Sequence, residues 1–135
     1  MGNQMKIESA MHPFPHSVGL DQTLRVALDL LASHGIRHLP VCEAGRVKGV
    51  LTDRDIEFAL RVEKADPEDL KVRDCYTPDP YTVPGNTPVA EVSRRMAHEH
   101  IGCALIVEAD RVVGIFTTVD ACRVLAEVLS GRKEQ

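Results

Sequence analysis

The chain has 135 residues, of which 44% are hydrophobic and 27% charged, and this composition excludes a disordered or fibrous protein. Its length is that of one ordinary domain, which buries about two-thirds of the surface that the unfolded chain exposes. A net charge of −4 argues against a nucleic-acid partner. The sequence has no apolar run near 18 residues and no signal peptide, so we expect no membrane segment and a cytoplasmic location.

The first copy of a repeated pattern begins with a predicted helix between Asp21 and Gly35. Asp21 is a suitable N-cap residue, and apolar side chains recur at helical spacing after it, at Leu24, Ala27, Leu28 and Leu31. A β-hairpin is predicted next, with strands over 38–42 and 46–52 joined by a turn at Ala44 and Gly45. A second helix is predicted from Asp53 to about residue 64.

The same order of elements returns after the polar, proline-interrupted stretch EKADPEDL. Asn86 is predicted to cap a helix, strands are predicted over 103–108 and 111–117, and a last helix is predicted from Thr118 to about residue 129. We place the two copies at residues 5–64 and 72–130, with a connector at 65–71 and tails at 1–4 and 131–135. Each copy has the order strand, helix, strand, strand, helix.

A constant offset of 65 residues relates the two copies without an insertion. The matched pairs include Pro13 and Pro78, Pro15 and Pro80, Val18 and Val83, Ile36 and Ile101, Gly49 and Gly114, Thr52 and Thr117, and Asp55 and Asp120. A register held over this length predicts an α/β fold of two β-α-β-β-α repeats, related by an approximate two-fold.

The repeated heptads GVLTDRD (49–55) and GIFTTVD (114–120) carry the candidate chemistry. A strand that ends at Thr52 and feeds a helix places free N–H groups and the positive end of the helix dipole beside a hydroxyl, which suits an anion. Asp55, one turn later, offers two acceptor oxygens that match the two hydroxyls of a ribose. The alternative is a helix capping box, which has the same Ser/Thr-x-x-Asp/Glu spacing. Spacing alone leaves both interpretations open.

Metal and disulfide chemistry are not predicted. The four cysteines are widely spaced and form no C-x-x-C pair, so buried thiols are expected. Among the six histidines, His34 and His38 have the i, i+4 spacing of ligands on one helix, but Gly35 interrupts the helix between them. We expect no metal site.

The whole pattern resembles a pair of cystathionine-β-synthase (CBS) domains, the Bateman module. The resemblance rests on M-x-P-x-P at 11–15, T-P-D-P at 77–80, I-R-H-L-P-V at 36–41 and the two heptads, and it covers nearly the whole chain. It implies two repeats packed sheet to sheet, two clefts that bind adenosine-containing ligands, and a module that senses rather than catalyses.

The resemblance also implies which residues line each cleft. In such modules the Thr and Asp come from one repeat, and the edge of a strand in the other repeat supplies the adenine wall. One cleft here would use Thr117 and Asp120 with Ile36, Arg37, His38 and Pro40. The other would use Thr52 and Asp55 with Ile101, Gly102 and Cys103.

The two implied clefts differ in charge. Arg37 and His38 can donate to a phosphate, whereas Gly102 and Cys103 have no side chain for this, so we expect the Thr117/Asp120 cleft to bind phosphate more tightly. Arg54, inside the first heptad, is either a phosphate ligand of the other cleft or a solvated surface charge. His38 is alternatively an ordinary packed imidazole.

Three functions remain at this point. The first is a regulatory, energy-sensing module that binds AMP, ADP or ATP and signals to an unknown effector protein. Its ligand is alternatively S-adenosylmethionine or NAD(H), and no catalytic cofactor is expected. The second is a scaffold or interaction module that binds no nucleotide. The third, an enzyme, is not expected, because no nucleophile with a neighbouring base and no carboxylate pair is present. The resemblance further implies a homodimer formed through the helices.

Overall fold

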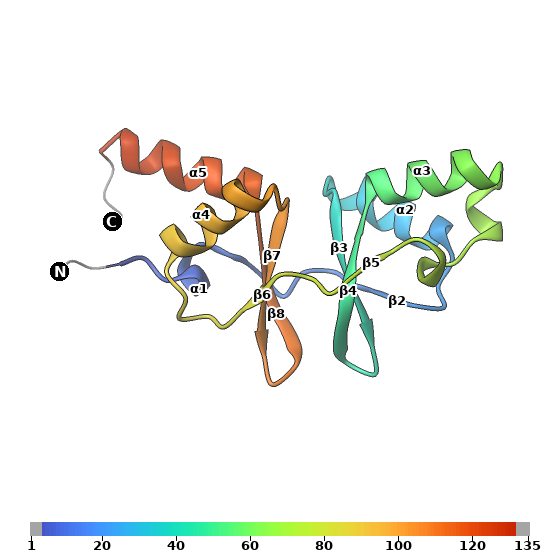
Figure 1. Ribbon diagram of the computed structural model, residues 1–135, viewed down its shortest axis with the longest axis horizontal. Coiled ribbons are helices and arrows are strands. Elements are labelled where there is room, and N and C mark those ends of the chain that lie inside the picture. Colours follow the sequence, from blue (N-terminus) through green and yellow to red (C-terminus); the bar gives the residue numbers. More distant parts are fainter. Residues whose placement is uncertain (1–3, 132–135) are drawn as a thin grey trace. The chain divides into compact units, whose positions relative to one another are not determined.

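The structure is a computed structural model that describes residues 4–131, so the predicted tails lie outside it apart from Gln4 and Gly131. The chain divides into two compact units, each with its own sheet and core (Figure 1). Unit 2 comprises Pro15–Pro80, and unit 1 comprises the chain before Pro15 and after Pro80. The prediction of a mixed α/β chain with two repeats is confirmed; the arrangement of the repeats about a two-fold axis stays a prediction.

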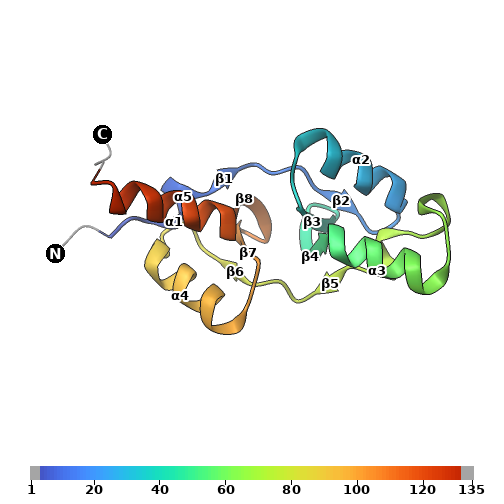
Figure 2. The same ribbon diagram turned by 90° about the horizontal axis from the view of Figure 1, so that it is seen from above.

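Unit 2 contains a four-stranded sheet with the strand order β2-β3-β4-β5. Its strands are β2 (Val18–Gly19), β3 (His38–Glu43), β4 (Arg46–Thr52) and β5 (Thr77–Pro78), and its helices are α2 (Leu24–His34) and α3 (Asp53–Glu63). Both helices cover the same face of this sheet (Figures 1 and 2). The core lies between them and the sheet, and its fully buried side chains include Leu24, Leu39, Leu51, Ile56 and Val72.

Unit 1 repeats this arrangement with the strand order β1-β8-β7-β6. Its strands are β1 (His12–Pro13), β6 (Thr82–Val83), β7 (Cys103–Glu108) and β8 (Arg111–Thr117), and its helices are α1 (Ile7–Ala10), α4 (Val89–Glu99) and α5 (Thr118–Leu129). The core between helices and sheet contains Ile7, Val92, Ala104, Ile106 and Phe116. The predicted strands and last helix of this copy are confirmed with the same boundaries.

Each hairpin turns through two residues in the left-handed region of backbone space. Ala44 and Gly45 have φ of 53° and 80°, and Ala109 and Asp110 have φ of 53° and 66°. Two successive left-handed residues match the right-handed twist of the flanking strands and give a tight two-residue hairpin. The predicted turn at Ala44 and Gly45 is therefore confirmed.

The short strands β1 and β5 are exchanged between the two repeats. Local patterns in the sequence do not predict this exchange. β1 pairs with β8, which belongs to the second copy of the sequence repeat, and β5 pairs with β4 of the first copy. After β1 the chain crosses into unit 2 at Phe14, and after β5 it crosses into unit 1 beyond Asp79. Both residues lie between prolines and have positive φ, 46° and 55°. The first segment of each repeat therefore forms a strand in the sheet of the other repeat.

Both predicted helix caps are wrong. Thr23 is the N-cap of α2 and accepts a hydrogen bond from the Val26 N–H, whereas Asp21 lies earlier in a turn and accepts two hydrogen bonds from Arg73. Pro88 precedes α4 without any side-chain cap, and Asn86 lies inside the Pro84–Thr87 turn. A tight turn follows the first strand of each copy, and Asp21 and Asn86 are part of these turns. They therefore cannot occupy the N-cap positions of α2 and α4.

The connector is more ordered than its composition predicts. It contains a short 3-10 turn at Pro67–Asp69, and a second 3-10 turn follows directly at Val72–Asp74, where Val72 is fully buried in the unit 2 core. Glu68 pairs with Arg25 of α2 at 3.2 Å. The connector is therefore packed against the helices of unit 2.

Candidate functional site

The corner between β4 and α3 is a capping box built by Thr52 and Asp55. Thr52 is in extended backbone conformation at the end of the strand, which turns its side chain toward the first turn of the helix. The Asp55 N–H donates to the Thr52 Oγ1 at 3.0 Å, and the Thr52 N–H donates to the Asp55 Oδ2 at 3.0 Å. These two bonds satisfy N–H groups that have no partner within the helix itself.

The corner between β8 and α5 is built in the same way. The Thr117 N–H donates to the Asp120 Oδ2 at 2.9 Å, and the Asp120 N–H donates to the Thr117 Oγ1 at 3.3 Å. The Thr117 hydroxyl also lies 3.2 Å from the Asp120 Oδ2. The capping alternative is thus confirmed for both heptads. It does not exclude a ligand, because a carboxylate can accept several hydrogen bonds.

The residues predicted for a binding wall, just before and within β3, lie beside the corner of their own repeat. His38 is paired with Thr52 in the β3–β4 ladder, and the Asp53 N–H donates to the Arg37 carbonyl oxygen at 3.2 Å. The Arg37 guanidinium is largely exposed and lies 3.9 Å from the Asp53 carboxylate. A long contact between exposed groups contributes little to stability, so Arg37 is free to take another partner.

The remaining predicted residues of unit 2 differ in exposure. Ile36 packs partly against the core, and Pro40 is buried within β3 opposite Val50, away from solvent. Arg54 lies in the first turn of α3 and is exposed. Thus Arg37 and Arg54 present cationic side chains to solvent in this unit, whereas Ile36 is apolar and half-buried and Pro40 is buried.

In unit 1 the matching residues carry no charge. Cys103 is paired with Thr117 in the β7–β8 ladder, and the Thr118 N–H donates to the Gly102 carbonyl oxygen at 3.2 Å. Ile101 packs partly against the core. Burial raises the pKa of the Cys103 thiol to about 12, so this side chain stays protonated and neutral.

His38 is a second titratable residue of the candidate walls whose pKa is shifted. Burial of the imidazole lowers its pKa below the usual value of 6.5, against an opposing effect of the Asp53 carboxylate. At neutral pH the ring is therefore uncharged and carries a single N–H donor. Arg37 is the charged donor of this pair.

Arg123 and Thr77 distinguish the two corners, and neither is among the site residues predicted from the sequence. Arg123 lies 2.9 Å from the Asp120 Oδ1 and also donates to the Ala10 carbonyl oxygen at 3.2 Å. Among residues 4–131 no cation pairs with Asp55, whose second contact is the Thr77 hydroxyl at 3.4 Å. The i, i+3 spacing of Asp120 and Arg123 on a helix was the available signal. The Thr77 contact depends on the pairing of β5 with β4, which no local pattern predicts.

The structure brings together the residues of each repeat, at the corner and at the start of the neighbouring strand. The predicted clefts instead combine Thr117 and Asp120 with residues 36–40, and Thr52 and Asp55 with residues 101–103. In each case the two sets belong to different units. These cleft compositions stay predictions.

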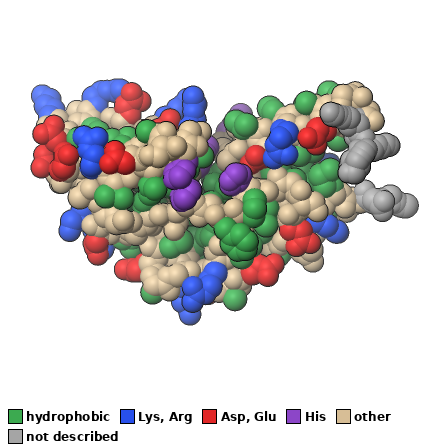
Figure 3. All heavy atoms as spheres, turned by 180° about the vertical axis from the view of Figure 1, so that it is seen from behind, with side chains coloured by type: hydrophobic (Ala, Val, Ile, Leu, Met, Phe, Trp, Pro, Cys, Tyr) green, Lys and Arg blue, Asp and Glu red, His purple; other side chains and the backbone are tan. Residues whose placement is uncertain are grey.

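Two other kinds of site, for a metal ion and for a membrane, concern residues 4–131. Within this range no three His, Cys, Asp or Glu side chains lie close enough together to hold a metal ion. Likewise, none of the helices described is both long and apolar enough to cross a membrane. On the face drawn in Figure 3, Lys and Arg side chains are interspersed with Asp and Glu.

Comparison with known proteins establishes the family. The CBS domain model matches residues 7–61 and again residues 72–127. The chain therefore belongs to the CBS domain family and carries two such domains in tandem, as its motifs indicated.

Relatives and solved structures agree with this assignment. Hypoxic response protein 1 of Mycobacterium tuberculosis is 31% identical over 111 residues, which cover 82% of this chain and 78% of that protein. AcuB from Vibrio cholerae has a TM-score of 0.86 at 25% identity, with 98% of this chain and 100% of that chain covered. The CBS domain pair of protein MJ0100, in complex with 5'-methylthioadenosine and S-adenosyl-L-methionine, has a TM-score of 0.85 at 25% identity, with 93% and 99% covered.

Proposed function

We propose that this chain is a regulatory module that binds an adenosine-containing ligand and signals to a partner protein, without catalysing a reaction. The observation that carries the proposal is the duplicated corner, in which a threonine hydroxyl, helix N–H groups and a carboxylate converge at the end of a strand. The similarity to the MJ0100 pair, crystallised with two adenosyl compounds, supports the ligand class. AMP, ADP and ATP are the ligands we favour.

Each corner retains acceptor capacity after capping. At Asp55 the two hydrogen bonds from Thr52 and Thr77 both end on Oδ2, and no described residue donates to Oδ1. The outer oxygen can therefore accept a ribose hydroxyl without breaking the cap. At Asp120 the Oδ1 is already paired with Arg123, so a ribose must share this oxygen or displace the guanidinium.

Phosphate binding is proposed to favour the cleft formed by Thr117 and Asp120. Arg37 supports this choice, because its guanidinium is exposed and held only by a long contact with Asp53. His38 adds one neutral donor, so Arg37 supplies the charge. Arg54 would serve the other cleft, where it is the exposed cation nearest in sequence to Thr52 and Asp55.

A scaffold without a ligand is the second candidate function, and the capping boxes favour it. Both Thr/Asp pairs already have a structural role in starting α3 and α5, so duplication of the heptad can be explained without a nucleotide. The two candidates differ in what the aspartates do beyond stability. We further propose that the module acts as a homodimer, in either case.

Isothermal titration calorimetry with AMP, ATP, S-adenosylmethionine, 5'-methylthioadenosine and NADH tests the proposal. Asp55→Asn and Asp120→Asn keep a capping oxygen but remove the charge, so we expect each to weaken binding at its own cleft about tenfold or more. Asp74→Asn is the matched control, because Asp74 accepts a backbone hydrogen bond at 2.8 Å outside both corners. Absence of binding by the wild-type protein to every compound would favour the scaffold.

A further inference from the structure

The two corners, called here the Asp55 corner and the Asp120 corner, differ in the residue that follows each aspartate by one helical turn. This residue is Phe58 in α3 and Arg123 in α5, at matched positions of the two repeats. Both lie three residues after their aspartate, so each side chain neighbours that aspartate on the helix surface. Phe58 is 65% exposed and has no hydrogen-bond donor, whereas Arg123 has a guanidinium.

The Arg123 guanidinium is held at two points. Its Nη2 donates to the Asp120 Oδ1 at 2.9 Å and to the Ala10 carbonyl oxygen at 3.2 Å. Ala10 ends the short helix α1 and is buried in the core of unit 1 together with Ile7. The second hydrogen bond therefore ties the guanidinium to a packed backbone segment and keeps it beside Asp120.

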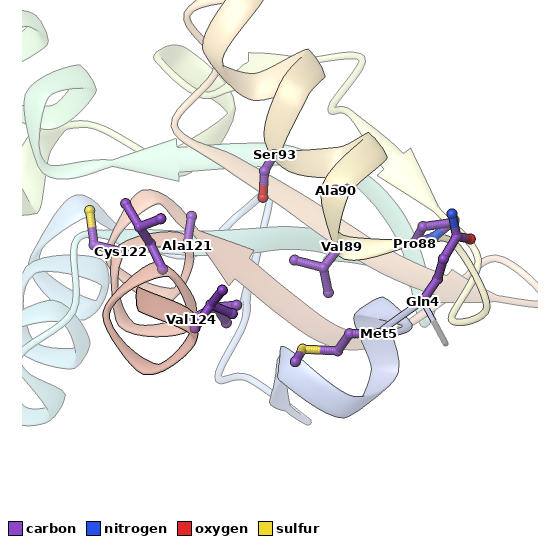
Figure 4. Close-up of a pocket in the computed structure, with 11 residues that line it drawn as sticks. Gln4, Met5, Pro88, Val89, Ala90, Ser93, Ala121, Cys122 and Val124 are labelled. Carbon is purple, nitrogen blue, oxygen red and sulfur yellow. The ribbon is translucent and has the colours of Figure 1, made fainter. Parts of the chain in front are cut away.

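The neighbours of Arg123 along α5 face an apolar groove, which Arg123 itself does not line. Ala121, Cys122 and Val124 line this space of about 440 Å³ between α4 and α5, together with Val89 of α4 (Figure 4). The 11 residues that line the groove carry no charge. The charge of Arg123 therefore acts at the corner and not in the groove.

The Asp120 carboxylate consequently offers less to a ribose than the Asp55 carboxylate does. At Asp120 the Oδ2 accepts hydrogen bonds from Thr117, and the Oδ1 accepts one from Arg123. At Asp55, no hydrogen bond from residues 4–131 ends on the Oδ1. A ribose hydroxyl at Asp120 must either displace the guanidinium or share an oxygen whose charge is already paired, and both routes weaken the hydrogen bond that it gains.

We propose that Arg123 is a specificity-determining residue that makes the two corners unequal toward ribose. The Asp55 corner selects ligands that carry both ribose hydroxyls, including ribosides without a phosphate such as 5'-methylthioadenosine. The Asp120 corner depends little on these hydroxyls and takes its affinity from the rest of the ligand. The inference rests on the proposed nucleotide-binding function and adds to it the part of the ligand that each corner recognises.

Calorimetry with adenosine and 2',3'-dideoxyadenosine, which lacks both ribose hydroxyls, tests this proposal with one corner disabled at a time. Asp120→Asn leaves the Asp55 corner, where hydroxyls bonded to a carboxylate should make adenosine bind about tenfold more tightly than the dideoxy compound. Asp55→Asn leaves the Asp120 corner, where this preference should be about threefold or less, because the carboxylate is paired.

Exchanging the residues at the matched position should exchange these preferences. Arg123→Phe, added to Asp55→Asn, should raise the preference of the Asp120 corner for adenosine to about tenfold, because the Oδ1 is released. Phe58→Arg, added to Asp120→Asn, should lower the preference of the Asp55 corner to about threefold, because a guanidinium now neighbours the carboxylate.

Two further variants separate this role from a general effect of charge or stability. Arg123→Lys keeps a cation three residues after Asp120 and should leave the preference close to that of the protein with Arg123. Arg61→Ala is the matched control, because Arg61 pairs with Glu57 of its own helix at 3.7 Å and unit 1 carries Ala126 at the same position. Arg61→Ala should change neither preference.

The outcomes separate this inference from the proposed function. An unchanged preference after Arg123→Phe would overturn the inference, and so would weaker binding of adenosine itself, which would make Arg123 a contact of the ligand. If the Asp55→Asn protein binds adenosine neither with nor without Arg123→Phe, the inference is overturned, while binding by the Asp120→Asn protein still supports the proposed function. Absence of binding by the wild-type protein to every adenosyl compound would overturn the proposed function, and this inference with it.

Discussion

The difference between the two corners predicts that Asp120→Ala destabilises the protein more than Asp55→Ala does. Loss of an N-terminal capping interaction costs about 1 kcal/mol, and this applies at both corners. Asp120 additionally loses the ion pair with Arg123, in which the Asp120 side chain is only 15% exposed and the Arg123 side chain is about half exposed. A pair with one partner in solvent contributes about 0.5 kcal/mol. At Asp55 the lost extra contact is a hydroxyl at 3.4 Å, which is weak.

The expected free-energy losses are therefore about 1.5 kcal/mol for Asp120→Ala and about 1 kcal/mol for Asp55→Ala. For a chain of this size these losses lower the melting temperature by roughly 6 °C and 4 °C, respectively. Differential scanning calorimetry of the protein without ligand measures both. Because the two units have separate cores, urea unfolding followed by two probes should accompany it.

A double-mutant cycle isolates the ion pair from the cap. Arg123→Ala should cost about 0.5 kcal/mol in the wild-type background and less in the Asp120→Ala background, because its partner is already gone. A residual cost is expected from the Ala10 carbonyl, to which Arg123 also donates. The reasoning is refuted if Asp55→Ala is as costly as Asp120→Ala, or if Arg123→Ala costs the same in both backgrounds.

Three further predictions concern packing and titration. Gly49→Ala should lower the free energy of unfolding by about 2 kcal/mol, as measured in urea, because the new Cβ meets the rigid Thr77 carbonyl. Gly114→Ala should lower it by about 1 kcal/mol or less, because the new Cβ meets the flexible end of Met11. Equal losses would contradict this reasoning. The pKa of His38 is lowered in the folded protein, so the free energy of unfolding should fall as the pH drops below 6.5. It should fall less in His38→Gln, and parallel pH profiles of the two proteins would contradict this. Cys103, with its pKa raised to about 12, should be alkylated only as the protein unfolds, and labelling at the rate of an unfolded peptide would contradict this.

Local patterns in the sequence were sufficient for the secondary structure of each copy. The strand β4, the strands β7 and β8 and the helix α5 have the boundaries that the patterns predicted, because hairpin turns and apolar periodicity act over only a few residues. The constant offset of 65 residues predicted two equivalent units. The family then followed from motifs that recur in register.

The caps of α2 and α4 show where local reasoning failed. Asp21 and Asn86 are good capping residues by type, but a tight turn after each first strand shifts the helix start to residues 24 and 89. Asp21 is instead bonded to Arg73, 52 residues away. Tertiary contacts also hold each helix start, because the Leu24 N–H donates to the Leu70 carbonyl oxygen and the Val89 N–H donates to the Met5 carbonyl oxygen.

The Thr/Asp corners were determined by the sequence itself, because the spacing within each heptad encodes both the strand end and the first helical turn. Only the tertiary structure decided what surrounds them: the Arg123 contact with Ala10 and the Thr77 contact with Asp55 both depend on segments distant in the chain. The same holds for the exchange of β1 and β5 between the repeats. Pairing and packing between distant segments are set by the free energy of the whole fold, which a local pattern does not contain.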